Sequence, residues 1–513
     1  MLKITNLTIE TEEHKQIVNG LNISLKKGDK LAIIGEEGNG KSTLLKVINN
    51  SKDIDKYCKV SGEIETFNQT IGYLEQSLNS DWNDKEVYEY FVKNSPYDEI
   101  EYEKFHDMNI FVEQLVKVGI QPSILDSTQK IGSLSGGEKV KIQIAKLLSA
   151  KPEILLLDEP TNDLDLETLE WLESFIQQQE NIIIFVSHDE TLLERTANMI
   201  LHLEYLQGKK EARHTWSKTD YATYVKNRKI RLEKQEQSYG REKREYLEDK
   251  RILSRQKSAV RTAQIKVKDS KIRRLLNKKM KNILVQERKA EEKKKTERVE
   301  VEEPIFMKFN EEIEMPSGKV VLDMKLDKLE VGGRVLSKDI NLFVKGAEKV
   351  GIIGKNGVGK TTLLKKIKEN FESREDISFG YMPQNYNEVL PSDIKSIDYI
   401  LSALEEEDSE LITAYMGRIK LTWEEMNTIT SKLSLGQKAK LILLYMMLSK
   451  NNVLLLDEPT RNISALSNPV VREILQSYKG AIISISHDRK YLSEVRDTVY
   501  ELTVDGLRKH LIT

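Results

Sequence analysis

The hydrophobic pattern divides the chain into three parts. Within residues 1–208 and 304–513, short apolar runs alternate with longer segments whose apolar residues follow a helical period. Strands that are covered by helices on both faces of a parallel sheet are apolar throughout, so these runs are predicted to be buried parallel strands. The runs are Lys30–Gly35, Ile154–Asp158, Ile182–Ser187, Lys349–Gly354, Val453–Asp457 and Ala481–Ser486. The pattern predicts two α/β domains with the same order of elements.

Residues 209–303 follow a different pattern, in which apolar residues recur at seven-residue intervals. Val225, Leu232, Tyr239, Tyr246 and Leu253 form one such series, and a weaker one contains Ile272, Leu276, Ile283 and Ala290. A narrow apolar stripe of this period predicts two long helices packed as an antiparallel hairpin. We expect arms of about 30–35 residues, on the order of 50 Å long. The turn should lie within Lys257–Lys271, and Glu291–Glu303 should form a charged connector to the second α/β domain.

The charge is distributed unevenly along the chain. The formal net charge is −2, yet Lys226–Arg298 contains 27 Lys and Arg residues against 11 Asp and Glu residues. Lys250–Lys281 contains 13 basic residues, one acidic residue (Asp269) and no aromatic residue. Such a segment favours contact with RNA phosphates over base stacking, although a solvated basic helix face is the alternative interpretation. Candidate RNA-binding residues near the turn are Arg255, Lys257, Arg261, Lys266 and Lys268.

The remaining composition limits the class of protein. The chain has 513 residues, of which 39% are hydrophobic and 32% charged. Its longest apolar run, Leu441–Leu448, falls far short of the roughly 20 residues that span a bilayer. Cys58 is the single cysteine, so an internal disulfide is excluded and a reducing compartment is favoured. We expect a cytoplasmic protein.

One set of nucleotide-site motifs occurs twice. Gly-Glu-Glu-Gly-Asn-Gly-Lys-Ser, which begins at Gly35, returns as Gly-Lys-Asn-Gly-Val-Gly-Lys-Thr at Gly354. Downstream, Leu-Ser-Gly-Gly-Glu, Asp-Glu-Pro-Thr and Ser-His-Asp motifs recur in the same order, with their counterparts 299 residues later. The glycine-rich motif predicts a loop whose backbone N–H groups bind phosphates where a strand meets a helix. Its candidate residues are Gly35, Gly38, Gly40, Lys41, Ser42 and Thr43, and Gly354, Gly357, Gly359, Lys360, Thr361 and Thr362.

Acidic residues and histidines follow the buried strands of both domains. Glu159 and Glu458 can polarise a water molecule that attacks a γ-phosphate, and His188 and His487 can contact that phosphate. Oxygen atoms that suit Mg²⁺ come from hydroxyl, amide and carboxylate side chains. These metal candidates are Ser42, Gln76, Asp158, Thr361, Gln384 and Asp457. The motifs therefore predict two ATP sites that require Mg²⁺ and hydrolyse ATP to ADP and phosphate.

These motifs resemble the ATP-binding cassette superfamily, over about 400 of the 513 residues. The resemblance implies two tandem P-loop cassettes, residues 1–208 and 304–513, joined by the helical linker 209–303. In that family two cassettes close head to tail, so each signature faces the opposite P-loop. Ser135, Gly136 and Gly137 would then complete the Lys360 site, and Ser434 and Gly436 would complete the Lys41 site. The functional unit would be a monomer with an intramolecular cassette pair.

The helical linker and the absence of a membrane domain narrow the resemblance to the ABC-F proteins, which bind the ribosome. The run Glu458–Ser467 is similar to the variant second cassette of ABC-F antibiotic-resistance proteins. The resemblance implies insertion of the linker through the tRNA exit site of the 70S ribosome, near 23S rRNA and tRNA. The implied activity is protection against lincosamides, streptogramin A compounds and pleuromutilins, with ATP hydrolysis driving release and no integral membrane partner.

Three other functions compete with ribosome protection. A housekeeping ABC-F translation factor is the strongest alternative, although several of those carry a long insertion that the first domain lacks. The ATPase subunit of a transporter would leave the basic hairpin without a purpose. A DNA-repair or chromosome-organising ATPase would require zinc cysteines or a much longer coiled coil.

Several residues depart from the family pattern. Asp163 stands where the family commonly has histidine, Ser464 stands opposite Asp165, and Leu435 replaces a signature glycine. The Lys41 site, which this altered signature completes, is therefore expected to hydrolyse ATP differently from the Lys360 site. Neither P-loop is preceded by a convincing aromatic residue for stacking on adenine, so ATP is inferred from its abundance in cells.

Overall fold

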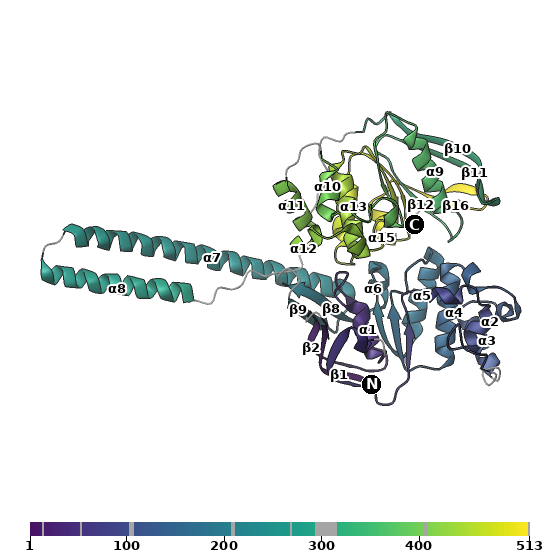
Figure 1. Ribbon diagram of the computed structural model, residues 1–513, viewed down its shortest axis with the longest axis horizontal. Helices are drawn as coiled ribbons and strands as arrows, with labels where there is room; N and C mark the ends of the chain where they lie inside the picture. Colours follow the sequence, from purple (N-terminus) through teal and green to yellow (C-terminus); the bar gives the residue numbers. More distant parts are fainter. Residues whose placement is uncertain are drawn as a thin grey trace. The chain divides into compact units, whose positions relative to one another are not determined.

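The computed structural model describes residues 1–12, 15–51, 54–101, 107–206, 211–266, 269–292, 315–404 and 409–510. Its contacts group the chain into two compact units, Met1–Tyr221 with Pro304–Thr513, and Ala222–Glu303. The first unit holds two α/β domains and the second holds a helical hairpin (Figure 1). The predicted fold class is therefore confirmed.

The first domain is built on a six-stranded sheet with the order β5-β6-β7-β3-β8-β9. Its neighbouring strands are parallel except at the edge, where β9 runs antiparallel to β8. A separate antiparallel sheet has the order β2-β1-β4. The strands are β1 (Leu2–Thr11), β2 (Gln16–Leu25), β3 (Lys30–Ile34), β4 (Cys58–Glu65), β5 (Ile71–Leu74), β6 (Ile154–Asp158), β7 (Ile182–Val186), β8 (Met199–Leu206) and β9 (Glu211–Ser217). The α-helices are α1 (Lys41–Ile48), α2 (Val87–Val92), α3 (Met108–Lys117), α4 (Gly136–Ser149), α5 (Leu166–Gln178) and α6 (Glu190–Thr196).

The second domain repeats this plan, with the sheet order β13-β14-β15-β12-β16-β17 and a two-stranded β10-β11 sheet. Its strands are β10 (Val320–Val331), β11 (Arg334–Lys345), β12 (Lys349–Ile353), β13 (Phe379–Met382), β14 (Val453–Asp457), β15 (Ala481–Ile485), β16 (Thr498–Thr503) and β17 (Gly506–His510). Its α-helices are α9 (Lys360–Glu372), α10 (Ser396–Leu401), α11 (Ser409–Arg418), α12 (Trp423–Met426), α13 (Leu435–Leu448), α14 (Asn468–Ser477) and α15 (Arg489–Glu494).

All six predicted parallel strands are present, because their side chains are buried on both faces. In β6, β7, β14 and β15 every residue is buried. Helix α1 packs against β6 and β7, and residues of β1 and β2 join the same apolar core. Helix α9 packs in the same way against β14 and β15. Each P-loop therefore joins a buried central strand to a helix that packs against two other strands of the same sheet.

The hairpin consists of α7 (Tyr221–Lys266) and α8 (Ser270–Glu292), which run antiparallel (Figure 1). The Nζ atom of Lys257 lies 2.6 Å from a carboxylate oxygen of Glu287, and the Gln264 amide donates to Asn277 over 2.9 Å. Val225, Leu232, Tyr239, Tyr246 and Leu253 are all half-buried, as their heptad spacing predicts. In α8, Ile283 is buried but Ile272 is 46% exposed. The prediction of an apolar stripe on α8 is therefore only partly confirmed.

Two predictions about the linker need correction. Residues 211–217 form β9 and pair with β8, so the helical segment begins at Tyr221 and not at residue 209. Alternation in this short polar strand is too weak to be read from the sequence, and its pairing with β8 stabilises it. The arms are also unequal, with 46 residues in α7 and 23 described residues in α8. The helices end and begin at Lys266 and Ser270, inside the predicted range for the turn. No described helix is long and apolar enough to cross a membrane.

Candidate nucleotide sites

The first P-loop joins β3 to α1. Gly40, the N-cap of α1, has φ of 80°, a left-handed conformation that glycine adopts without strain. The Lys41 ammonium donates to the carbonyl oxygens of Gly35 and Glu36 over 2.9 and 3.0 Å. Ser42 Oγ lies 2.9 Å from an Asp158 carboxylate oxygen, and Thr43 follows in the first turn of α1. A lysine and the N-terminus of a helix thus face the same loop, as phosphate binding requires.

The second P-loop has the same geometry between β12 and α9. The Lys360 ammonium donates to the carbonyl oxygens of Gly354 and Lys355 over 2.7 and 3.1 Å. Thr361 Oγ1 donates to Asp457 over 2.8 Å. Each site therefore presents one hydroxyl and one carboxylate side by side.

The glutamate of the first domain has three polar neighbours. Glu159 has φ of 47°, a conformation that non-glycine residues rarely adopt and that is often found at functional sites. Its carboxylate lies 3.0 Å from His188 Nε2 and accepts hydrogen bonds from Asn162 (3.0 Å) and Gln76 (3.3 Å). Burial favours the neutral acid, but His188, Lys41 and Asn162 outweigh burial and lower the pKa of Glu159 to about 2. This carboxylate is therefore ionised at neutral pH and can accept a hydrogen bond from a water molecule.

The equivalent glutamate of the second domain has a different environment. Glu458 has φ of 54°, and its carboxylate accepts a hydrogen bond from the backbone N–H of His487 over 3.2 Å. The ring Nε2 of His487 lies 3.8 Å away, farther than in the first domain. Burial, together with the negative charge of Asp457, raises the pKa of Glu458 to about 8. Burial and the nearby Lys360 lower the pKa of His487 to about 3. The pKa values of Glu159 and Glu458 are therefore shifted in opposite directions, although both glutamates stand in the same motif.

The predicted metal ligands lie beside the P-loops. Burial raises the pKa of Asp158 to about 6 and also raises the pKa of Asp457. Each carboxylate is within hydrogen-bonding distance of a P-loop hydroxyl, and a divalent cation could take the place of that proton-mediated contact. Gln76 and Gln384 are exposed, and the Gln384 amide lies 3.4 Å from Asp163 of the first domain. This set of hydroxyl, carboxylate and amide oxygens fits Mg²⁺.

The signature of the second domain lies against the first P-loop. Ser434 caps α13 by accepting a hydrogen bond from the Gln437 backbone N–H over 3.3 Å. The backbone N–H of Gly436 donates to the carboxylate of Glu37 in the first P-loop. Lys440, one turn further along α13, lies 2.5 Å from Glu36. Ser434 and Gly436 are therefore brought to the Lys41 side.

The signature of the first domain lies on the Lys360 side. A cavity of about 650 Å³ has Gly136 on one wall and Lys360, Thr361 and Thr362 on another. Its other walls include Gln384, Asp457, Glu458 and His487. Ser135 and Gly137 flank Gly136 at the start of α4, where Ser135 is the N-cap. An added Cβ on Gly136 would lie 2.5 Å from the Asp163 carbonyl oxygen, so the close approach requires glycine.

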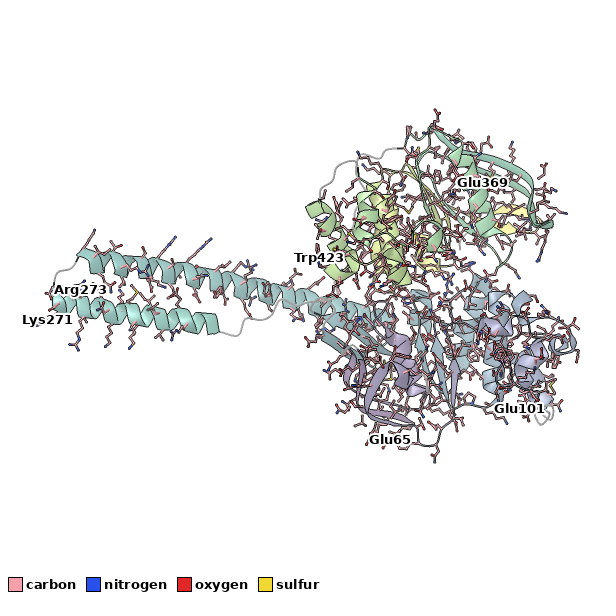
Figure 2. The ribbon with its side chains drawn as sticks, viewed as in Figure 1. Glu65, Glu101, Lys271, Arg273, Glu369 and Trp423 are labelled. Carbon is pink, nitrogen blue, oxygen red and sulfur yellow. The ribbon has the colours of Figure 1, made fainter. Side chains whose placement is uncertain are left out.

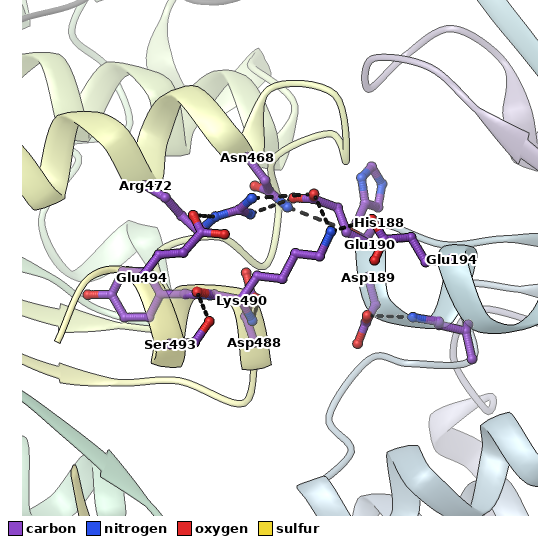
Figure 3. A network of polar contacts seen from close by, with 12 residues as sticks. His188, Asp189, Glu190, Glu194, Asn468, Arg472, Asp488, Lys490, Ser493 and Glu494 are labelled. Carbon is purple, nitrogen blue, oxygen red and sulfur yellow. Dashed lines mark hydrogen bonds and ion pairs between the residues drawn. The ribbon is translucent and has the colours of Figure 1, made fainter. Parts of the chain in front are cut away.

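A buried polar network links the two domains next to His188 (Figure 3). Glu190 of α6 pairs with Arg472 of α14 and Lys490 of α15, and only 4% of the Arg472 side chain is exposed. The side-chain amide of Asn468 lies 3.4 Å from the backbone oxygen of His188. The segment that contains His188 and Glu190 therefore contacts the second domain directly.

The predicted RNA-binding residues of the hairpin differ in accessibility. Arg255, Arg261 and Lys266 are exposed, whereas the Lys257 ammonium is already paired with Glu287. Lys268 lies outside the described residues. Figure 2 shows Lys271 and Arg273 at the start of α8, and both are exposed. Lys257 is thus engaged within the hairpin, and the other three described candidates present free surface.

Sequence reasoning missed several residues that line or bridge the sites. They are Glu36, Glu37, Asn162, Asn356, Arg461, Ser467 and Asn468. Glu36 and Glu37 occupy the variable positions of the P-loop motif, which carry no family signal. The charge contrast with Lys355 and Asn356 at the same positions of the second domain was the available clue.

Comparison with known proteins matches residues 18–162 and 337–461 to a family model described as ABC transporter. These segments together cover more than half of the chain. The ABC transporter ATP-binding protein YfmM of Bacillus subtilis (strain 168) is 29% identical over 523 residues, covering 94% of each chain. ABC transporter F family member 5 of Arabidopsis thaliana is 25% identical over 527 residues, covering 93% of this chain and 71% of the relative.

A solved structure has the same fold. It is the complex of archaeal ribosomal stalk protein aP1 and archaeal ribosome recycling factor aABCE1, with a TM-score of 0.56 and 16% identity. The likeness covers 95% of this chain and 86% of that chain. The family match, the paired P-loops and the relatives agree, and the chain belongs to the ABC transporter family of ATP-binding domains, whose cassettes are ATPases.

Proposed function

We propose that this protein is a ribosome-binding ABC-F ATPase that protects the ribosome from antibiotics of the peptidyl-transferase centre. One observation carries the proposal: in the sequence, a basic antiparallel hairpin separates two ATPase domains, and the signature of the second domain contacts the P-loop of the first. The hairpin presents exposed Arg255, Arg261 and Lys266 close to where α7 ends. A long helical arm of this charge suits the phosphate backbone of structured RNA.

The relatives support a ribosomal partner. One relative is named as a member of the F family, and one protein of the same fold is named as a ribosome recycling factor. A transporter subunit would give the basic hairpin no polyanion to bind. We therefore assign the linker to rRNA and tRNA in the exit site of the 70S ribosome.

Binding and hydrolysis of ATP would switch the protein between a ribosome-bound and a released state. The P-loop amides with Lys41 and Lys360 would bind the phosphates of ATP, and Ser42, Thr361, Asp158 and Asp457 would hold Mg²⁺ with Gln76 and Gln384. Bound Mg²⁺ would neutralise phosphate charge. Glu159 and Glu458 would orient the attacking water, and His188 and His487 would contact the γ-phosphate. ATP would hold the two domains together, and hydrolysis would release the protein from the ribosome.

The resistance subtype rests on the second domain. The run Glu458–Ser467 is similar to resistance ABC-F proteins, and two of its serines, Ser464 and Ser467, bind Glu36 of the first P-loop. This altered loop is thus part of the contact between the domains. A housekeeping translation factor shares the hairpin and the ATPase domains, and drug protection separates the two.

Cell-free bacterial translation tests the proposal. A lincosamide or a pleuromutilin is added at an inhibitory concentration, and the purified protein is titrated in with ATP. We expect synthesis to be restored, because target protection needs no membrane. The matched control carries Lys41→Ala and Lys360→Ala, which should bind phosphate poorly and give no protection.

The other outcomes distinguish the alternatives. If the wild type fails to restore synthesis but Glu159→Gln with Glu458→Gln still blocks translation, a housekeeping factor is favoured. If neither protein affects translation, the ribosomal assignment is wrong.

A further inference from the structure

The first P-loop carries two glutamates where the second carries a lysine and an asparagine. Glu36 aligns with Lys355, and Glu37 aligns with Asn356. A P-loop binds the negative charges of a nucleotide, so two carboxylates within it act against its ligand unless other groups bind them. Both carboxylates are in fact bound by the second domain.

Glu37 binds the signature itself. Its carboxylate accepts a hydrogen bond from the backbone N–H of Gly436, the second residue of the 14-residue helix α13. The first N–H groups of a helix have no partner inside the helix and point toward an anion. In the nucleotide site of the proposed function, this N–H would face the terminal phosphate of a nucleotide bound by Lys41. Glu37 therefore occupies an anion position that a third phosphate would need.

Glu36, the preceding residue of the chain, binds the second domain through a separate set of contacts. Its carboxylate lies 2.5 Å from Lys440 Nζ and accepts hydrogen bonds of 2.6 Å from both Ser464 and Ser467. The Glu36 side chain is 15% exposed. Burial works against its charge, but Lys440 and the two hydroxyls lower the pKa of Glu36 to about 2. Ser464 stands where the first domain has Asp165, and an aspartate here would repel Glu36.

The Lys360 site has no such carboxylate at the equivalent position. Asn356 donates its amide to the Asp163 carbonyl oxygen over 2.5 Å, and Lys355 pairs with Glu167 over 3.0 Å. The cavity of about 650 Å³ lies between Lys360 and Gly136. At this site a terminal phosphate would therefore lie beside the neutral side chain of Asn356 and could enter the cavity.

We propose that Glu37 makes the Lys41 site select a nucleoside diphosphate over a nucleoside triphosphate. The α- and β-phosphates bind the P-loop amides and Lys41, away from the Glu37 carboxylate. A γ-phosphate must take the Gly436 N–H from Glu37 and sit beside its negative charge. The inference rests on the nucleotide-site part of the proposed function, makes the Lys41 site the weaker of the two for ATP, and is independent of the ribosome.

Equilibrium binding to the full-length chain tests this selectivity. Lys360→Ala disables the other site, and isothermal titration with Mg²⁺ compares ADP with AMP-PNP. We expect the Lys360→Ala protein to bind ADP at least as tightly as AMP-PNP. Adding Glu37→Asn, which copies Asn356, should strengthen AMP-PNP binding roughly tenfold and change ADP binding less than about twofold, because a charged contact is exchanged only for the γ-phosphate.

Two further variants keep the result interpretable. Glu37→Gln preserves side-chain size and should act in the same direction, so it replaces the asparagine variant if that variant misfolds. Glu63→Asn on β4 removes an exposed carboxylate elsewhere and should alter neither affinity. Equal strengthening of ADP and AMP-PNP would overturn the proposal, as would a clear preference for AMP-PNP before Glu37 is changed.

The experiment distinguishes failure of the proposed nucleotide site from failure of the proposed diphosphate selectivity. If no variant with Lys360→Ala binds either nucleotide, while Lys41→Ala still binds through the Lys360 site, the Lys41 site is not a nucleotide site and both assignments of it fail. Loss of ribosome binding or of drug protection alone leaves the selectivity measurement unchanged.

Discussion

Single residues in identical motifs acquire different chemistry from their neighbours. Glu159 and Glu458 both follow a buried aspartate and both adopt a left-handed backbone conformation. His188, Lys41 and Asn162 lower the pKa of Glu159, whereas burial and the negative charge of Asp457 raise the pKa of Glu458. The same Asp-Glu-Pro-Thr motif therefore gives its two glutamates different pKa values, according to the groups that surround each one.

Glu36→Gln should destabilise the contact between the two α/β domains. The change leaves the ammonium of Lys440, which is 9% exposed, without its charge partner, and we expect a loss of about 3 kcal/mol in the free energy of unfolding. Since the pKa of Glu36 is lowered in the folded chain, its contribution is fully present above pH of about 4.5 and is lost as the pH falls toward about 2. Chemical denaturation of both proteins at pH 7 and at pH 3.5 measures this difference.

Glu65→Gln is the matched control for that experiment. Glu65 pairs with Lys3 over 3.7 Å, and both side chains are about half exposed. Exposed pairs contribute on the order of 0–1 kcal/mol, so this variant should remain close to the wild type. Equal effects of Glu36→Gln and Glu65→Gln would contradict the assigned role of Glu36.

Arg472→Met should be more damaging than its removal together with its partner. The single change removes the shorter of the two ion pairs of Glu190, which is 7% exposed, and leaves Lys490 as its remaining partner, at a cost of about 3 kcal/mol. The double variant Arg472→Met with Glu190→Leu removes that charge and should recover most of the loss. Thermal denaturation of both variants measures the difference. A double variant no more stable than the single one would show that the ion pair is not the source of the effect.

At the scale of elements, one set of hairpin residues packs the two helices together, and a different set is exposed and available to bind RNA. Heptad residues of α7 are half-buried, and Lys257 pairs with Glu287 to fasten the two helices together. Arg255, Arg261 and Lys266 remain exposed. Some basic residues of the hairpin therefore pair within it, and others are exposed to solvent.

Neutralising the outward-facing cations should change the salt dependence of ribosome binding. In Arg255→Gln, Arg261→Gln, Lys266→Gln, each lost phosphate contact should reduce the slope of log affinity against log salt by about 0.7–0.9. Sedimentation with ribosomes at several salt concentrations provides the slope. Lys226→Gln, Lys229→Gln, Arg231→Gln removes the same charge from exposed positions near the start of α7 and should leave the slope near that of the wild type. Identical slopes in the two triple variants would argue against contact near the turn.

At the scale of the whole molecule, the two nucleotide sites are unequal. Glu36 and Glu37 of the first P-loop bind the signature and the following loop of the second domain. The Lys360 site instead has an open cavity against Gly136. Side chains of both domains also meet at the Lys360 site, where Asn356 binds Asp163 and Lys355 pairs with Glu167. The sites differ in the carboxylates of the first P-loop and in the cavity beside Lys360, and we expect nucleotide-driven change to be greatest at the Lys360 site.

Glu159→Gln together with Glu458→Gln should hold the protein on the ribosome. The amides cannot orient water as a base does, so ATP would stay bound and the two domains would stay together. Sedimentation in ATP should show the double variant in the ribosomal fraction after the wild type has been released. Release at the wild-type rate would contradict the role of hydrolysis in dissociation.

The local sequence was sufficient for the fold, the P-loops and the helical hairpin. Short apolar runs bounded by polar residues formed the buried strands, although the apolar run Leu441–Leu448 lies in helix α13. Gly-x4-Gly-Lys requires the left-handed glycine turn seen at Gly40 and Gly359. Heptad spacing likewise decides which face of α7 is covered. These features depend on residues that are neighbours in the chain. The start of the linker was misplaced because β9 depends on its distant partner, β8.

Tertiary structure alone decided the partners of charged residues. Glu36 meets Lys440 and Glu190 meets Arg472, across about 400 and 280 residues of chain respectively. The energy of a charge depends on its burial and on the charges within a few ångströms, and neither is written in local sequence. For that reason the sequence predicted the same role for both glutamates, whereas burial and the charged neighbours in each domain lower the pKa of Glu159 and raise the pKa of Glu458.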